Sequence, residues 1–287
     1  MAGDMKCCLN ILRRTPPSDV NDNLERLIAL RPDLDEELCQ RVDTPLEIEM
    51  DTKANKPFLL CDYNRDGDSY RSPWSNDYFP EIDDDEEGFK PSNKLRKLEI
   101  EANKVFDVYR EWYFEGGISS VYMWDLDNGF AACFCVAKES KSDDLKGNWS
   151  SIHVFEVTGT DKKDQYEYKL TSTVLVSMPF KSKGLGDIDL SGSMTKQASK
   201  TFTLKSYGDT KESHIEYMGP MIEDIELDLR NTIDGVYFQK TKEIINGMRV
   251  VDAEIKQRDK KLQKISKQAA DGKIKKNVNY VESKNDE

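Results

Sequence analysis

The chain has 287 residues, of which 37% are hydrophobic, 9% aromatic and 33% charged, and its formal net charge is -12. This length and apolar content suffice for a substantial core, in one large domain or two modest ones. The acidic charge argues against general nucleic-acid binding, and no window reaches the roughly 20 apolar residues of a membrane span. The N-terminus lacks the apolar segment of a signal peptide, and the six cysteines form no C-x-x-C pair. We therefore expect a cytoplasmic protein with reduced thiols.

Residues 1–44 are expected to form a stalk of three short helices. Apolar residues recur at helical spacing from about Asp4 to Arg14, Ser18 is placed to cap a second helix, and Pro32 stands where a third would begin. Residues 45–91 are expected to be irregular or short-stranded and to carry an acidic loop.

A run within this second segment partly matches an EF-hand calcium loop. Suitable residues stand at its first, third, fifth and sixth positions: Asp62, Asn64, Asp66 and Gly67. The twelfth position, which should carry a bidentate Glu, is Pro73, and neither flank predicts a helix. The composition favours a turn stabilised by Asn and Asp side chains. A calcium-binding, EF-hand-like regulatory module remains the alternative function.

Residues 92–117 predict one connecting helix, with Ser92 as its N-cap and Gly116–Gly117 as its end. Its expected apolar face consists of Leu95, Leu98, Ala102, Val105, Phe106, Tyr109 and Tyr113.

Residues 118–210 predict a five-stranded antiparallel meander, so the fold class is α+β. The expected strands cover 118–125, 130–138, 151–158, 166–178 and 191–204. Asn128–Gly129 is typical of a tight hairpin between the first two strands. A meander leaves edge strands with unpaired backbone groups. We therefore expect a partner subunit to complete the sheet.

Residues 213–251 predict a long helix packed across the sheet, with Pro220 in its first turn. Residues 252–287 form a basic tail, in which Leu262, Ile265 and Ala269 follow helical steps. Two interpretations of this tail stay open: an amphipathic helix that binds a groove on an acidic partner, or a disordered terminus.

The sequence does not predict an enzyme, because it contains no nucleophile elbow, zinc-protease motif, P-loop or dinucleotide fingerprint. His153 lies in a strand pattern, which favours a packed or hydrogen-bonded side chain over a catalytic base. Cys133 and Cys135 face one side of a strand without further ligands nearby, so they are interpreted as core thiols. No cofactor or metal is expected.

Several runs along the chain, taken in order, carry a recognisable pattern: Leu59–Asn76, Leu95–Ala102, Tyr113–Gly117, Ser119–Tyr122, Trp124–Asp127, Ser151–His153, Tyr168–Val174, Tyr237–Phe238 and Lys240–Lys242. In matching order, these runs resemble the beta-subunit family of the heterodimeric F-actin capping proteins. Together they span most of the chain, to about Val251.

The resemblance implies an alpha/beta heterodimer in which helical stalks carry one continuous sheet, with five strands and one long helix from each subunit. Such a dimer caps the barbed end of actin filaments in the cytoskeleton, independently of calcium and without a catalytic step. It also implies partners beyond actin: the dynactin complex, capping-protein-interaction motif proteins and phosphoinositides.

The resemblance further implies that Arg230, Lys138 and Lys146 face actin. It implies that the tail is a mobile amphipathic extension that binds actin's hydrophobic cleft through Leu262, Ile265 and Ala269. The tail departs from the family pattern in being longer, more basic and interrupted by Gly272. Asp228 stands where the family has a basic residue, which removes a positive charge beside Arg230.

Overall fold

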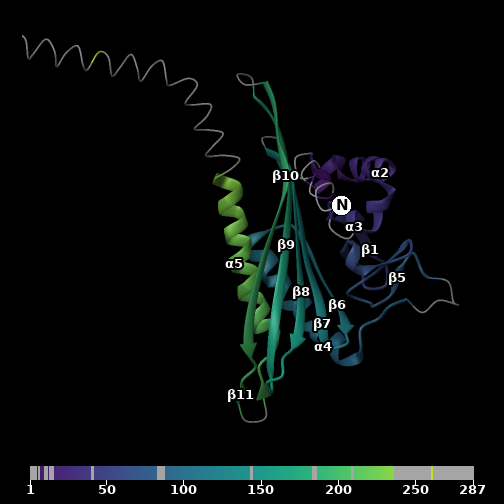
Figure 1. Ribbon diagram of the computed structural model, residues 1–287, viewed down its shortest axis with the longest axis vertical. Coiled ribbons are helices and arrows are strands. Elements are labelled where there is room, and N and C mark those ends of the chain that lie inside the picture. Colours follow the sequence, from purple (N-terminus) through teal and green to yellow (C-terminus); the bar gives the residue numbers. More distant parts are fainter. Residues whose placement is uncertain are drawn as a thin grey trace, which may run out of the picture. The chain divides into compact units, whose positions relative to one another are not determined.

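The computed structural model describes residues 5, 7–9, 12, 16–39, 42–82, 88–142, 145–182, 186–207, 210–235 and 260 (Figure 1). The chain divides into two compact units, Met1–Leu229 and Arg230–Glu287. The first unit contains the sheet and nearly all of the described structure. No helix in the described part of the chain is long and apolar enough to cross a membrane.

A five-stranded antiparallel sheet forms the centre of the first unit, which confirms the predicted α+β meander. Its strand order is β10-β9-β8-β7-β6, with every neighbouring pair antiparallel. The strands are β6 (Ile118–Leu126), β7 (Gly129–Ser142), β8 (Leu145–Gly159), β9 (Gln165–Ser182) and β10 (Gly186–Thr203). The predicted hairpin joins β6 to β7, and Gly129 is required there because a Cβ would lie 1.9 Å from the Val157 carbonyl oxygen.

The later strands are longer than predicted. β8 begins at Leu145 rather than Ser151, and β10 begins at Gly186 rather than Ser191. The added residues mix apolar side chains, such as Leu145 and Ile188, with lysine, aspartate and glycine, so these short segments give a weaker strand signal than the predicted ones. Backbone pairing with the neighbouring strands extends them, as in the match of Gly186 with Ser182.

Two helices cover one face of this sheet, α4 (Asn93–Tyr113) and the part of α5 (Ile215–Ile233) that belongs to the first unit (Figure 1). Ser92 caps α4 as predicted, because its Oγ accepts a hydrogen bond from the Leu95 amide at 3.4 Å. Phe106 of α4 meets Phe134 of β7 edge to face, with ring centroids 5.2 Å apart. The buried side chains of α5 in this unit include Met218, Met221, Ile222, Ile225 and Leu229.

The prediction that Pro220 lies in the first turn of α5 is wrong. The helix begins at Ile215, whose amide donates to Ser213 Oγ at 3.4 Å, and the amide of Met218 donates to the carbonyl of His214 at 3.1 Å. This turn starts the helix before the proline, which then lies inside it. The predicted continuation to Val251 lies outside the described residues.

The apolar face predicted for α4 is only partly buried. Leu95, Ala102 and Phe106 are buried, whereas Val105 is 50% exposed and Tyr113 43% exposed. Apolar residues occur around more of this helix than the sheet can cover, so the pattern alone overstated its buried face.

The opposite face of the sheet meets segments that precede α4. Their helical elements are η1 (Pro17–Asp19), α2 (Val20–Leu30), η2 (Pro32–Leu34), α3 (Asp35–Cys39) and η3 (Asp62–Asn64). Their strands are β1 (Glu47–Asp51), β2 (Lys56–Leu60), β3 (Arg65–Asp66), β4 (Ser69–Arg71) and β5 (Tyr78–Phe79). The remaining strands, β11 (Ser206–Tyr207) and β12 (Thr210–Lys211), form a small hairpin after β10.

The N-terminal elements share a small apolar core made of Met5, Cys8, Leu12, Leu34 and Leu38. The assignment of Ser18 as an N-cap is wrong. Ser18 lies inside η1 and its hydroxyl donates to the Asp19 carboxylate, because Pro17 starts the turn one residue earlier.

Candidate partner interface

The two outer edges of the sheet differ in their hydrogen bonding. At the β6 edge, the amide of Val121 donates to Asn103 Oδ1 at 2.8 Å, and Asn103 Nδ2 donates to the Val121 carbonyl at 2.9 Å. The amide of Met123 donates to Glu99 Oε2 at 2.6 Å, and the Met123 carbonyl accepts from Arg71 at 3.4 Å. Side chains thus occupy the backbone groups that a further strand would need, so this edge is sealed.

The sealing carboxylate is itself held by a buried ion pair. Arg71 donates to both oxygens of Glu99, at 2.9 and 2.7 Å, and Arg96 makes a further contact with the same carboxylate. A bidentate guanidinium–carboxylate pair of this kind fixes geometry as well as charge. The stretch around Arg71 therefore has a structural role: it positions the group that closes the sheet.

The same stretch gives the calcium alternative no support. Asn64 Nδ2 donates to the carbonyls of Leu59 and Arg71, at 3.3 and 2.9 Å, and Asn64 Oδ1 accepts from the Cys61 amide at 3.0 Å. Asn64 is buried and its amide group is directed at the backbone, where it stabilises the turn. The third position of the proposed calcium loop is therefore committed to the protein's own chain.

The β10 edge differs, since β10 pairs in the described part of the chain with β9 alone. The strand is 18 residues long. Exposed side chains recur along its second half: Thr195, Gln197, Ser199, Lys200, Thr201 and Thr203. A long exposed edge presents backbone donors and acceptors to another chain.

Helix α5 is tied to this open edge by two ion pairs. Lys196 Nζ lies 2.5 Å from Asp228 Oδ2, and Lys200 Nζ lies 3.1 Å from Asp224 Oδ2. Leu227, between these two acids, is 60% exposed. Strand β10 and helix α5 therefore form one continuous surface of exposed backbone edge, charged pairs and an apolar side chain.

The structure describes three of the six residues predicted to contact actin. Lys138 lies in β7, half-buried, opposite Trp149 in the register. Lys146 lies in β8 opposite Lys141. Arg230 lies in the last turn of α5, half-buried, at the start of the second unit. The tail residues Leu262, Ile265 and Ala269 lie outside the described residues.

Sequence reasoning missed the side chains that seal β6, although a signal was present. Glu99 and Asn103 are four residues apart, between the buried Leu95 and Phe106. A polar pair on the apolar face of a helix implies buried partners that satisfy it. The sequence alone does not identify these partners, because they are backbone groups of a strand far away in the chain.

One group of side chains in the described residues could hold a metal ion, and it lies away from this edge. Cys61, Cys133 and Cys135 are all buried, with their sulfur atoms within 4.8 Å of one another. The prediction that the pair on β7 has no further ligand nearby is therefore wrong, because the chain brings in Cys61 from the end of β2.

The described fold is thus an α+β unit whose five-stranded sheet has one sealed and one open edge, with a helix tied to the open edge. Residues 5–245 match the family described as F-actin capping protein, beta subunit, and the chain belongs to this family. By this membership it is the beta subunit of a heterodimeric actin-filament capping protein.

Two individual relatives agree with the family match. The chain is 48% identical over 246 residues to the F-actin-capping protein subunit beta of Drosophila melanogaster, covering 85% of this chain and 87% of the relative. It is 46% identical over 249 residues to the subunit of the same name from Dictyostelium discoideum, covering 85% and 89%. A homodimeric actin capping protein alpha subunit from Plasmodium berghei has 16% identity and a TM-score of 0.48, over 85% of this chain and 94% of that one.

Proposed function

We propose that this chain pairs with an alpha subunit through the outer edge of β10, and that the heterodimer caps the barbed end of actin filaments and blocks subunit gain and loss. The open β10 edge carries the proposal. An alpha-subunit strand added there continues the sheet across the interface and satisfies the backbone groups that β9 does not reach. The sealed β6 edge supports β10 as the site of pairing, since no backbone group is available at Val121 or Met123.

The actin-facing side of the dimer is assigned to basic residues and to the tail. Arg230, Lys138 and Lys146 supply positive charge for an acidic surface of actin, which raises the rate of encounter and fixes orientation. Leu262, Ile265 and Ala269 are assigned to an amphipathic helix that enters an apolar cleft on the terminal actin subunit. The N-terminal helices serve as the stalk that supports the sheet.

Capping of this kind requires no catalytic step and no calcium. The protein acts in the cytoplasm, on the actin cytoskeleton. The dynactin complex, capping-protein-interaction motif proteins and phosphoinositides are proposed as further partners on the strength of the family resemblance.

The function is tested by seeded actin elongation with this chain co-expressed with a matching alpha subunit. Barbed-end growth should slow in proportion to the fraction of barbed ends bound by the heterodimer. The effect should be equal with calcium present or chelated, because the side chain of Asn64, the third position of the calcium-loop-like run, is hydrogen-bonded to backbone groups. Seeds whose barbed ends are already blocked provide the control for pointed-end growth. Unchanged barbed-end growth at saturating heterodimer would refute the proposal.

The pairing edge is tested separately by residue-resolved hydrogen exchange on the assembled heterodimer. In an edge strand, every second amide points to solvent and exchanges quickly, whereas in a strand paired on both sides consecutive amides are slow. We expect consecutive slow amides across Thr195–Thr201. Alternating fast and slow amides there would place the interface elsewhere, even if capping itself were observed.

A further inference from the structure

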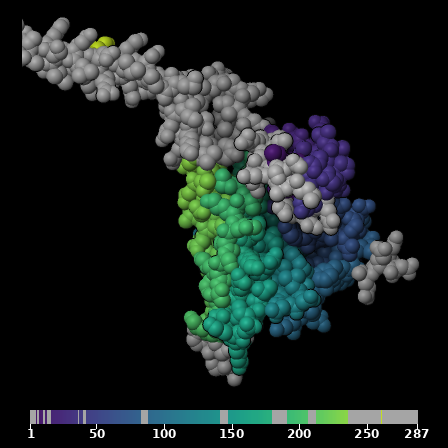
Figure 2. Space-filling model, viewed as in Figure 1, coloured from purple at the N-terminus to yellow at the C-terminus, as the bar shows by residue number. Residues whose placement is uncertain are grey.

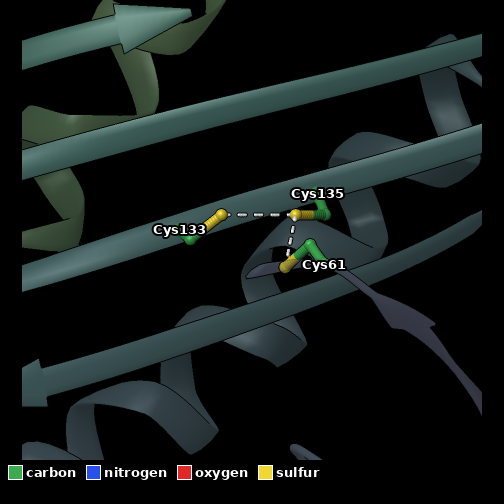
Figure 3. Close-up of side chains that lie close together, drawn as sticks. All are labelled: Cys61, Cys133 and Cys135. Atoms are coloured by element: carbon green, nitrogen blue, oxygen red, sulfur yellow. Dashed lines mark hydrogen bonds between the residues drawn. The ribbon is translucent and has the colours of Figure 1, made fainter. Parts of the chain in front are cut away.

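Three thiols converge in the core on the side of the sheet opposite α5. Cys133 and Cys135 lie two residues apart on β7, so their side chains share one face, and Cys61 reaches the same place from the end of β2. The Sγ atoms of Cys133 and Cys135 are 3.3 Å apart, and those of Cys135 and Cys61 are 3.8 Å apart. Figure 3 shows the three sulfur atoms directed toward one another.

This spacing matches that of sulfur ligands around a single ion. With metal–sulfur bonds of about 2.3 Å, as for zinc and thiolate, neighbouring sulfurs lie about 3.8 Å apart in a tetrahedral site and about 4.0 Å apart in a trigonal one. The observed separations are 3.3 Å, 3.8 Å and at most 4.8 Å. Shifts of a few tenths of an ångström would bring all three sulfurs onto one ion.

The surroundings hold the thiols in place and are mainly apolar, although the amide oxygen Oδ1 of Asn64 lies 3.5 Å from Cys61 Sγ. The other buried members of the shared cluster are Leu59, Tyr122, Ile152 and Leu175, and Tyr63 packs against it. Tyr122 Oη donates to the Leu59 carbonyl at 2.5 Å, and Asn64 Oδ1 accepts from the Cys61 amide at 3.0 Å. These bonds fix β2 and the start of η3 against the sheet, which preorganises Cys61 toward β7.

The thiols differ in their tendency to lose a proton. Burial raises the pKa of Cys133 and of Cys135 well above the ordinary thiol value. Burial also opposes ionisation of Cys61, but hydrogen bonds from the other two thiols and from the backbone amides of Tyr63 and Asn64 outweigh it and lower the pKa of Cys61.

We propose that Cys61, Cys133 and Cys135 form a buried three-sulfur site for a soft, thiophilic metal ion, of which Cu(I) is the best-fitting species. Soft thiolate ligands select such ions over calcium or magnesium. A Cu(I) ion bound by one deprotonated thiol and two protonated ones is electrically neutral, which suits apolar surroundings. A divalent ion would leave a buried charge until a second thiol lost its proton. Each thiol deprotonated on coordination releases its proton to solvent, so affinity should rise with pH.

An entry path exists on the Cys61 side. A cavity of about 650 Å³ reaches this residue, and its lining includes Asp43, Asp62 and Tyr63. Cys61 is 8% exposed, whereas Cys133 and Cys135 are fully buried. An ion would therefore meet the Cys61 sulfur first and then the two thiols on β7.

The test is an anaerobic titration of the reduced heterodimer with Cu(I) against a competing chelator. We expect the parent heterodimer to retain one equivalent of Cu(I) at the site. Each of Cys61→Ser, Cys133→Ser and Cys135→Ser should lower the affinity for Cu(I) at least about tenfold. The double variant Cys7→Ser/Cys39→Ser removes two exposed thiols outside the cluster and should bind as the parent does. All variants are assembled with the same alpha subunit, so differences belong to this chain.

Two further measurements keep the result interpretable if a serine variant folds poorly. Cys133→Ala and Cys135→Ala preserve an apolar side chain, and heterodimer assembly and capping report whether each variant is folded. X-ray absorption on the copper-loaded parent protein counts the ligands and should find sulfur only. Binding that survives all three cluster substitutions, binding lost in the Cys7/Cys39 variant, or a copper shell of nitrogen and oxygen would each overturn the proposal.

Discussion

Nε2 of His153 and Oε2 of Glu226 lie 2.8 Å apart in the interior, and this pair joins strand β8 to helix α5. The contact has the distance of an ion pair, although not the angles of a hydrogen bond. Other bonds complete the arrangement: His153 Nδ1 lies 2.9 Å from Ser172 Oγ, and Ser151 Oγ donates to Glu226 Oε1 at 3.1 Å. The expectation that His153 is a packed, hydrogen-bonded side chain is confirmed.

Removing this carboxylate should destabilise the first unit. Glu226→Ala leaves His153 and Ser151 without their partner in a buried site, and such losses cost about 3 kcal/mol or more. Glu223→Ala, on the same helix, removes an exposed carboxylate that accepts from Tyr113 Oη at 2.7 Å and should cost less than about 1 kcal/mol. The check is urea unfolding at one heterodimer concentration. Equal costs for the two variants would contradict the structural role of the pair.

Asp51 should contribute stability that depends on pH. Burial opposes its ionisation, but hydrogen bonds from Ser72, Ser75 and the amide of Ala54 outweigh this and lower its pKa to about 2. A folded-state pKa below the unfolded value means that the contribution is fully present above about pH 4 and is lost as the pH falls through 2.

Asp51→Asn tests this contribution, because it keeps the shape and removes the charge. The variant should be less stable than the parent by about 2 kcal/mol at pH 7, and the gap should shrink as the pH falls below 4. Denaturant unfolding at several pH values measures it. Asp68→Asn is the control, since Asp68 is exposed and should show no comparable gap. If the difference in unfolding free energy between the parent and Asp51→Asn stayed constant below pH 4, the charge of Asp51 would not be its cause.

Charge reversal at Arg230 should weaken capping in a salt-dependent manner. Arg230→Glu should lower affinity for barbed ends by about tenfold at low ionic strength, and the deficit should narrow as salt is added. Lys97→Glu makes the same change in net charge on an exposed position of α4 and should have less than about a twofold effect. Elongation assays at several salt concentrations compare them. If both variants were affected alike, net charge rather than position would be responsible.

Deletion after Val251 should weaken capping and leave the heterodimer assembled. The double variant Leu262→Ala/Ile265→Ala keeps the tail's charge while removing apolar contact, and should reproduce part of the loss. Gln263→Ala/Gln268→Ala changes the same number of residues in the same segment and should leave affinity unchanged. Size-exclusion chromatography and elongation assays separate the two effects. Loss of the heterodimer on deletion would instead assign the tail to the subunit interface.

Local patterns predicted the sheet and its order well. The turn chemistry of Asn128–Gly129 and the cap at Ser92 depend on neighbouring residues alone, so both were visible in the sequence. The position of Pro220 was misjudged, because a residue that often stands in the first turn of a helix lies inside this one, after a turn built by Ser213 and His214.

Long-range contacts could not be predicted in the same way. Cys61 joins Cys133 and Cys135 only once β2 lies under the sheet, and nothing in the residues next to Cys61 indicates that contact. The sequence could not show which sheet edge is sealed either, because Asn103 and Val121 meet only through the packing of α4 on β6. Such pairings depend on how whole elements pack together, which no local pattern contains.

The contrast between the two sheet edges has a consequence for assembly size. If β10 is the only edge able to accept a neighbour, two such sheets can join, and the joined sheet ends at a sealed β6 on this side. At the β6 end, no further sheet can then be added to the joined pair of sheets, so assembly does not continue there into a fibre. Asn103 and Glu99, which occupy the backbone groups of β6, would thus prevent this capping protein from polymerising through its own sheet.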